Sequence, residues 1–293
     1  MTDEESEIEA SRAPLLDHLT ELRTRLIWSL LAFVAAFILC FAFADAIYMF
    51  LLHPFEIAGA LMAAQKEGGG HMGPFDLLLA LAGLKEIATK GAPPLELVYT
   101  APLEFFFTKM KLAGFGAIVL SFPIIAFQLY RFVAPGLYRK EKNAFLPFLL
   151  AAPVLFLIGG ALVYYLMLPF VLWFSLSQQI AGPNVQVTLL PKVSDYMTLV
   201  TQLLLAFGLC FQLPVVLSLA GLAGLISSET LVKGRRYAIV GIVFVAAIVT
   251  PPDPISQIML SVPIYLLYEV SIWCVRLMER RRLKAEAAEA AVA

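Results

Sequence analysis

Two glutamates stand among basic residues, each beside a long apolar segment. Glu21 lies in the sequence HLTELRTR, just before the first such segment, and Glu141 ends the sequence FVAPGLYRKE, which lies between two others. A carboxylate binds a guanidinium through two parallel hydrogen bonds. Two such acids at one membrane face could therefore bind a doubly basic peptide.

Simpler roles would also account for both acids. Glu21 and Arg25 are four residues apart, so in a helix they would form an ion pair worth about 0.2–0.5 kcal/mol. Glu141 follows Arg139 and Lys140, which could serve only to orient the chain in a membrane and leave the acid in solvent. The sequence leaves both interpretations open.

Three more polar residues lie within or at the edge of apolar segments. Glu104 follows Pro102 and would sit in the first turn of a helix, where the helix dipole stabilises an acid, or in a pocket at membrane level. Gln202 and Gln212 lie inside a later segment. An unpaired amide in hydrocarbon is costly, so we expect them to bond between helices or to face water.

The chain shows no pattern of catalytic or metal-binding residues. Its three histidines are scattered, its three cysteines lie within apolar segments, and no zinc-protease, nucleophile-elbow or phosphate-loop motif occurs. We therefore expect a protein that is not an enzyme, with no catalytic residue, metal or cofactor.

Composition predicts an all-α polytopic membrane protein. The chain has 293 residues, of which 60% are hydrophobic and 15% charged, against about 25% charged in soluble domains. Six segments approach the roughly 20 apolar residues that a membrane helix needs. They are Leu26–Leu52, Leu103–Val133, Ala144–Leu176, Tyr196–Ile226, Tyr237–Val249 and Ile255–Val275. The third contains three prolines, so we expect it to be tilted, kinked or partly interfacial.

The basic residues predict the orientation. With the N-terminus in the cytoplasm, most of the 21 Lys and Arg residues fall on the cytoplasmic side, and the C-terminus lies there too. The acidic start of the chain and the lack of a cleavage site argue against a removed signal peptide. We expect an acidic tail at residues 1–14, a membrane domain at 15–278 and a cytoplasmic tail at 279–293. The first outer loop, about His53–Ala101, should hold a short interfacial helix at Phe75–Leu84.

The fifth apolar segment is unusually short. Tyr237–Val249 would span about 20 Å as a helix, whereas the hydrocarbon core is about 30 Å thick. Thr250 and Asp253 follow, among three prolines that stop the helix. Asp253 is therefore predicted to lie beneath the outer surface, where an acid is a functional candidate.

Several motifs in order resemble the TatC family of twin-arginine translocase proteins. They are HLTELRTRL (18–26), PLEFF (102–106), FVAPGLYRKE (132–141), TPPDPISQ (250–257) and the pattern P-x-x-x-L-Y-E (263–269). The resemblance covers about residues 15–278 and fits six spans with both termini inside. It implies the core receptor of a bacterial inner-membrane translocase that exports folded proteins.

The resemblance also implies roles for particular residues. Glu21, Arg23, Phe132 and Glu141 would bind the twin-arginine signal peptide. Single-span TatA-like and TatB-like partners would dock along the last two spans, at Thr250, Asp253 and Gln257, although Gln257 could instead cap its own helix. Pro54 also matches a family position. Many relatives carry a glutamate where this chain has Gln212, so a titrating acid is not expected there.

The alternative is a secondary transporter or channel for a small solute. Glu104, Gln202 and Gln212 would then line the path. A transporter needs a closed pocket, whereas a peptide receptor needs an open groove with Glu21 and Glu141 on one face.

Overall fold

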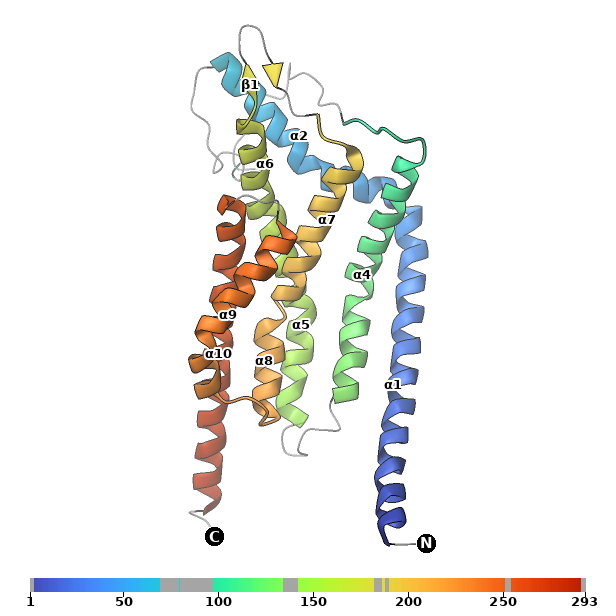
Figure 1. Cartoon of the computed structure of the whole chain (residues 1–293), viewed down its shortest axis with the longest axis vertical. Helices are drawn as coiled ribbons and strands as arrows, with labels where there is room; N and C mark the ends of the chain where they lie inside the picture. Colours follow the sequence, from blue (N-terminus) through green and yellow to red (C-terminus); the bar gives the residue numbers. More distant parts are fainter. Residues whose placement is uncertain are drawn as a thin grey trace.

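The computed structural model describes residues 3–68, 79, 97–133, 142–181, 186–187, 190–250 and 254–290, and these form a bundle of long helices (Figure 1). The elements are α1 (Asp3–Ala42), α2 (Ala44–Gly68), α4 (Glu104–Val133), α5 (Lys142–Leu162), the π-helical turn η3 (Val163–Met167), α6 (Leu168–Ser177), β1 (Ile180–Ala181), β2 (Gln186–Val187), α7 (Val193–Cys210), α8 (Leu213–Leu222), α9 (Ser228–Val249) and α10 (Pro254–Ala290). The two short strands pair antiparallel.

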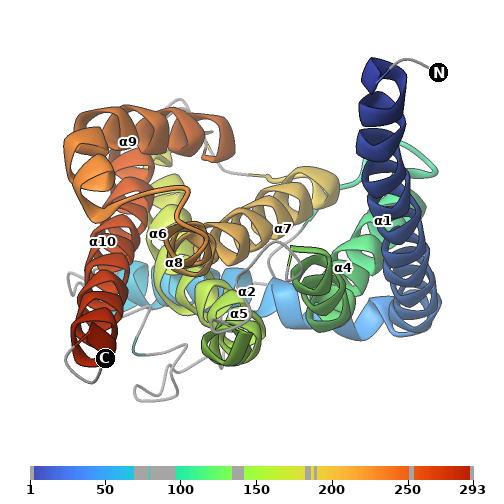
Figure 2. The same ribbon diagram turned by 90° about the horizontal axis from the view of Figure 1, so that it is seen from below.

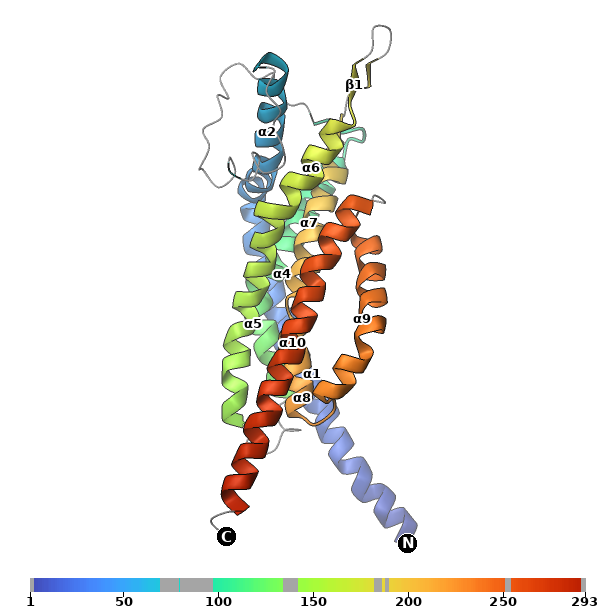
Figure 3. The same ribbon diagram turned by 90° about the vertical axis from the view of Figure 1, so that its left-hand side faces the viewer.

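Five segments of the described chain are long and apolar enough to cross a membrane. They are Leu19–Ala42, Glu104–Phe132, Leu150–Leu176, Val193–Leu222 and Gln257–Arg281. The remaining predicted span falls in α9, whose first turns are charged and whose apolar part is short. In Figure 3, α9 runs beside α10, which it contacts.

The predicted first span, Leu26–Leu52, was wrong at its C-terminal end, because α1 ends at Ala42. The helix breaks at Phe43, and α2 then leads away from α1 across the opposite end of the bundle (Figure 1). The break contains no proline or glycine. Next to the break, Ala44 is buried, and Asp45 at the start of α2 forms an ion pair with Lys109 of α4. The predicted loop from His53 was also wrong at its start, since α2 continues to Gly68; Phe75–Leu84 lies outside the described residues, apart from Leu79.

Pro54 lies inside α2, and a side chain from another helix replaces the backbone hydrogen bond that the proline removes. Proline has no N–H, so the carbonyl of Phe50, four residues earlier, loses its helical donor. The hydroxyl of Tyr164, in η3, donates to that carbonyl at 2.9 Å, and the Tyr164 and Phe50 rings stack with centroids 4.7 Å apart. The hydroxyl of Tyr196 donates to the neighbouring carbonyl of Leu51 at 2.9 Å. These bonds fix α2 to the bundle.

The third and fourth predicted spans are each interrupted. The π-helical turn η3 separates α5 from α6, and Pro169 lies in the first turn of α6, where its missing N–H is tolerated. A break at Phe211 and Gln212 separates α7 from α8, with Pro214 in the first turn of α8. Proline positions explain both breaks, but only the structure locates the π-helical turn.

The core lies around α7, which packs against α4 and α5. Glycines allow close approach there: a Cβ on Gly208 would lie 2.6 Å from the ring of Phe156, and one on Gly159 would lie 2.9 Å from the ring of Phe211. Figure 2 shows the α1–α4 pair on one side of this core and the α9–α10 pair on the other. α1 begins and α10 ends at the same end of the bundle, here called the terminal end (Figure 1).

Candidate functional site

Glu21 lies on α1 toward the terminal end, and its carboxylate is already engaged. The Nη2 of Arg25 donates to Oε1 of Glu21 at 2.9 Å, which confirms the predicted ion pair. The Nη1 of Arg25 donates to Oε1 of Gln128 on α4 at 3.2 Å. One guanidinium therefore joins the acid to the neighbouring helix.

A pocket of about 500 Å³ opens between α1 and α4 at this place. It is lined by Thr20, Glu21, Thr24, Arg25, Trp28, Gln128 and Arg131. The guanidinium of Arg131 lies over the ring of Phe127, 5.6 Å from its centroid. The pocket is thus lined by one partly exposed carboxylate, Glu21, and two guanidinium groups, Arg25 and Arg131. Only the carboxylate suits a cationic ligand.

The structure brings some of the predicted site residues together and leaves others apart. Arg23 is exposed and does not line the pocket, because two residues along a helix separate side chains by about 200°. Phe132 is half-buried in the last turn of α4, one turn beyond Gln128. Glu141 lies outside the described residues, so its proximity to Glu21 stays a prediction.

The predicted docking residues lie where α9 meets α10. Thr250 is buried, and its hydroxyl donates to the carbonyl of Ala246 at 2.9 Å within its own helix. The amide of Gln257 donates to the carbonyl of Val243 at 3.2 Å, so Gln257 joins α10 to α9. Asp253 lies outside the described residues.

The outward face of α9 is apolar and exposed. Tyr237, Val240, Phe244 and Ile248 follow helical spacing and are each more than 60% exposed. A face of this kind in a membrane contacts lipid or another helix.

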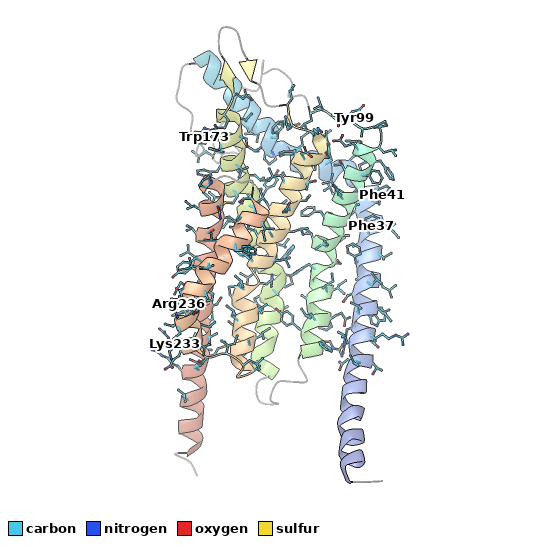
Figure 4. The ribbon with its side chains drawn as sticks, viewed as in Figure 1. Phe37, Phe41, Tyr99, Trp173, Lys233 and Arg236 are labelled. Atoms are coloured by element: carbon cyan, nitrogen blue, oxygen red, sulfur yellow. The ribbon has the colours of Figure 1, made fainter. Side chains whose placement is uncertain are left out.

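Toward the terminal end, α9 is held to α10 by polar bonds that the sequence did not predict. Arg235 donates to Glu269 at 2.7 Å, and Tyr265 donates to the other oxygen of Glu269 at 2.8 Å. Glu279 accepts from the backbone N–H of Ser228 at 2.8 Å at the start of α9. Lys233 and Arg236 project from the flank of α9 instead (Figure 4). The sequence pointed to only one of these residues, Glu269, which ends the motif P-x-x-x-L-Y-E (263–269). A basic residue before an apolar segment, such as Arg235, indicates orientation alone.

The three polar residues of the transporter alternative each form hydrogen bonds within the helix bundle. Glu104 accepts from the N–H groups of Thr100 and Ala101, at 2.8 and 3.2 Å, and from the hydroxyl of Ser194 at 2.7 Å. Its side chain therefore caps α4 and ties it to α7.

The two glutamines also join helices. The buried amide of Gln212 donates to the carbonyl of Ala152 on α5 at 2.9 Å, and that of Gln202 lies 3.4 Å from the carbonyl of Ile248. Neither they nor Glu104 line the pocket at Glu21 or the apolar cavity of about 810 Å³ beside α4 and α5. Within the described part of the chain, no three His, Cys, Asp or Glu side chains are grouped as metal ligands.

A family model described as Sec-independent protein translocase protein (TatC) matches residues 17–263. The chain belongs to the TatC family. A TatC protein of Magnetococcus marinus is 41% identical over 281 residues, covering 96% of this chain and 90% of its own. The TatC protein of Escherichia coli is 33% identical, covering 89% and 87%.

The fold agrees with this family. A crystal structure of a twin arginine translocase receptor TatC matches with a TM-score of 0.67 at 32% identity, covering 89% of this chain and 98% of that one. As a member of the TatC family, the chain is a membrane protein that takes part in protein transport. The arrangement of Gln128 and Arg131 around Glu21 is specific structural information that the family motifs alone did not provide. Gln128 and Arg131 are three residues apart, which places them on one face of a helix, and this spacing was the available signal.

Proposed function

We propose that this TatC-family protein is the core receptor of a twin-arginine translocase. It binds twin-arginine signal peptides at its cytoplasmic face, for export of folded proteins, and it is not an enzyme. The observation that carries the proposal is the open pocket that holds the carboxylate of Glu21 between α1 and α4. The family match and the TatC receptor structure support it.

The chemistry of the pocket suits this ligand. The side chain of Glu21 is 34% exposed, so a guanidinium can reach it from solvent. The chain continues from the end of α4, beside the pocket, into the segment that contains Glu141. A second carboxylate from that segment would bind the second arginine of the pair, with Arg23 and Phe132 at the edges of the site.

The proposed topology has six crossings, with α9 as a short fifth crossing before α10. Both termini then lie in the cytoplasm of a bacterium and the domain of residues 15–278 lies in its inner membrane. Phe37, Phe41 and Tyr99 gather toward the opposite end of α1 and α4, as at a membrane interface (Figure 4). The tails at 1–14 and 279–293 remain cytoplasmic.

TatA-like and TatB-like single-span proteins are the proposed partners. The exposed apolar face of α9 offers a surface for a transmembrane helix. The residues that the family resemblance implies for docking, Thr250, Asp253 and Gln257, would supply polar contacts, which set register where lipid is as apolar as the partner.

Site-directed photo-crosslinking tests the receptor function. A photoreactive residue at Thr24, in the pocket, should crosslink to a synthetic twin-arginine signal peptide. The same residue at Val240, on the outward face of α9, should not. A peptide in which both arginines are lysines is the matched ligand control. Equal crosslinking at both positions, or none at Thr24, would reject the assignment.

A further inference from the structure

The guanidinium of Arg25 occupies the acid to which the signal peptide is proposed to bind. It donates to Glu21 at 2.9 Å and to Gln128 at 3.2 Å, and its side chain is only 20% exposed. The bond from Arg25 engages one of the two carboxylate oxygens of Glu21, Oε1. The acid is therefore half-occupied by a group chemically identical to the one that it would receive.

We propose that Arg25 determines specificity: it competes for Glu21, so that the pocket selects arginine over lysine in the signal peptide. This inference rests on the proposed receptor function. Specificity often depends on a penalty against the wrong ligand as much as on attraction to the right one. Here the penalty is the bond from Arg25 to Oε1 of Glu21, which leaves only Oε2 to a ligand that cannot displace Arg25.

Arginine and lysine side chains of the peptide differ in the contacts that they can make with Glu21 in place of the bond from Arg25. An incoming guanidinium is planar and can bind the carboxylate through two N–H groups, so it replaces the contact from Arg25 with an equivalent or better one. An ammonium is a compact point charge without this fork. It leaves Arg25 as the better partner for Oε1 and is limited to a single contact at Oε2, whereas the guanidinium can use both oxygens.

Gln128 makes the exchange feasible. Its Oε1 holds Nη1 of Arg25, while the bond to Glu21 uses Nη2. When the peptide displaces Nη2, the guanidinium keeps one hydrogen bond on α4 and is not left without a partner. The other two arginines nearby are not placed to compete for Glu21 in this way. Arg131 stacks on Phe127, and Arg23 is exposed outside the pocket.

The test measures binding of two fluorescent peptides to the full chain in detergent. One peptide carries the twin arginines and the other carries two lysines in their place. In Arg25→Gln, the ratio of the two affinities should fall by about tenfold, roughly 1.4 kcal/mol, mainly because the lysine peptide binds better. Arg131→Gln is the matched control: it removes the same charge from the same pocket and should shift both affinities by the same factor.

Arg25→Lys separates geometry from charge and serves if Arg25→Gln does not fold. It keeps the charge but removes the fork, so the affinity ratio should again fall. An unchanged ratio in both Arg25 variants, or an equal fall in Arg131→Gln, overturns the inference while leaving the receptor function intact. Loss of binding of both peptides in the Arg25 variants also overturns it, because Arg25 would then be a direct ligand contact. If the unaltered protein binds neither peptide, the proposed function fails and this inference with it.

Discussion

At the scale of single residues, polar groups in this protein are held by partners on other helices. Arg25 reaches Gln128, Gln212 reaches the backbone of α5, and Tyr164 supplies the hydrogen that Pro54 cannot. In hydrocarbon no water can take over these bonds, so each partner matters to stability and position. Glu21 is different, because part of its carboxylate is left for a ligand.

Replacing Glu21 or Glu141 with alanine should weaken twin-arginine peptide binding. Each loss should be about 1.5–3 kcal/mol, the scale of a hydrogen bond to a charged group. The double variant should lose less than the sum, because both acids are predicted to bind one arginine pair. Titration of the peptide into purified protein measures this. Glu229→Ala, which removes an exposed acid from α9, is the control, and strictly additive losses would contradict a shared site.

Tyr164→Phe should destabilise the protein by about 1–3 kcal/mol, because the carbonyl of Phe50 loses its donor. Replacing Pro54 with alanine restores a backbone N–H at that turn. The same Tyr164→Phe change should then cost clearly less in a Pro54→Ala background. Tyr165→Phe, at a half-exposed neighbouring position, is the control. Thermal unfolding in detergent measures all four variants, and an equal cost in both backgrounds would show that Tyr164 does not compensate for Pro54.

At the scale of elements, the helices differ in how tightly they pack. α5 and α7 meet through glycines, whereas α9 is attached to α10 by polar bonds at its start and leaves an apolar face outside. In a membrane, helices associate by close packing and hydrogen bonds, because lipid is as apolar as the side chains. The α5–α7 contact is therefore suited to a fixed core, and α9 to contact with a partner.

Gly208→Ala should be destabilising by about 1–3 kcal/mol, the usual cost of overpacking. The new Cβ would lie 2.6 Å from the ring of Phe156, which itself stacks on Phe122. Gly160→Ala is the matched control on α5, since its Cβ would meet only Leu204, at 4.0 Å. That change should be neutral or slightly stabilising, because alanine has the higher helix propensity. Comparable melting temperatures for the two variants would disprove the close contact.

At the scale of the whole molecule, both chain ends leave the bundle at one end, while α2 and the β1–β2 hairpin lie at the other (Figure 1). An even number of crossings is the arrangement compatible with this. In the proposed topology α9, whose apolar part is short, supplies one of them, with local thinning of the bilayer or access of water near its end.

Single cysteines in a background without Cys40, Cys210 and Cys274 test this topology. A probe at Tyr99 should react with a membrane-impermeant thiol reagent added outside intact cells. A probe at Arg281 should react only after the cells are opened. Asp253→Cys should be labelled from outside, and a spin label there should report a depth beneath the headgroups. Labelling of Arg281 in intact cells would reverse the proposed orientation.

The sequence alone determined that this is an all-helical membrane protein of the TatC family. Hydropathy depends only on local composition, and the family motifs lie in order along the chain, so both are readable without a fold. The same reasoning gave the ion pair of Glu21 with Arg25 and the irregular third span with its prolines, because helical spacing and proline chemistry are local.

Only the tertiary structure decided which helices meet and where an apolar run turns. The break at Phe43 has no proline or glycine to signal it, and the ion pair of Asp45 beside it is with Lys109, on another helix. The partnership of Arg25 with Gln128, and of Arg235 with Glu269, joins residues far apart in the sequence. Apolar faces are nearly interchangeable in lipid, so hydropathy cannot specify partners; close packing and hydrogen bonds between helices do, and these exist only in the folded bundle.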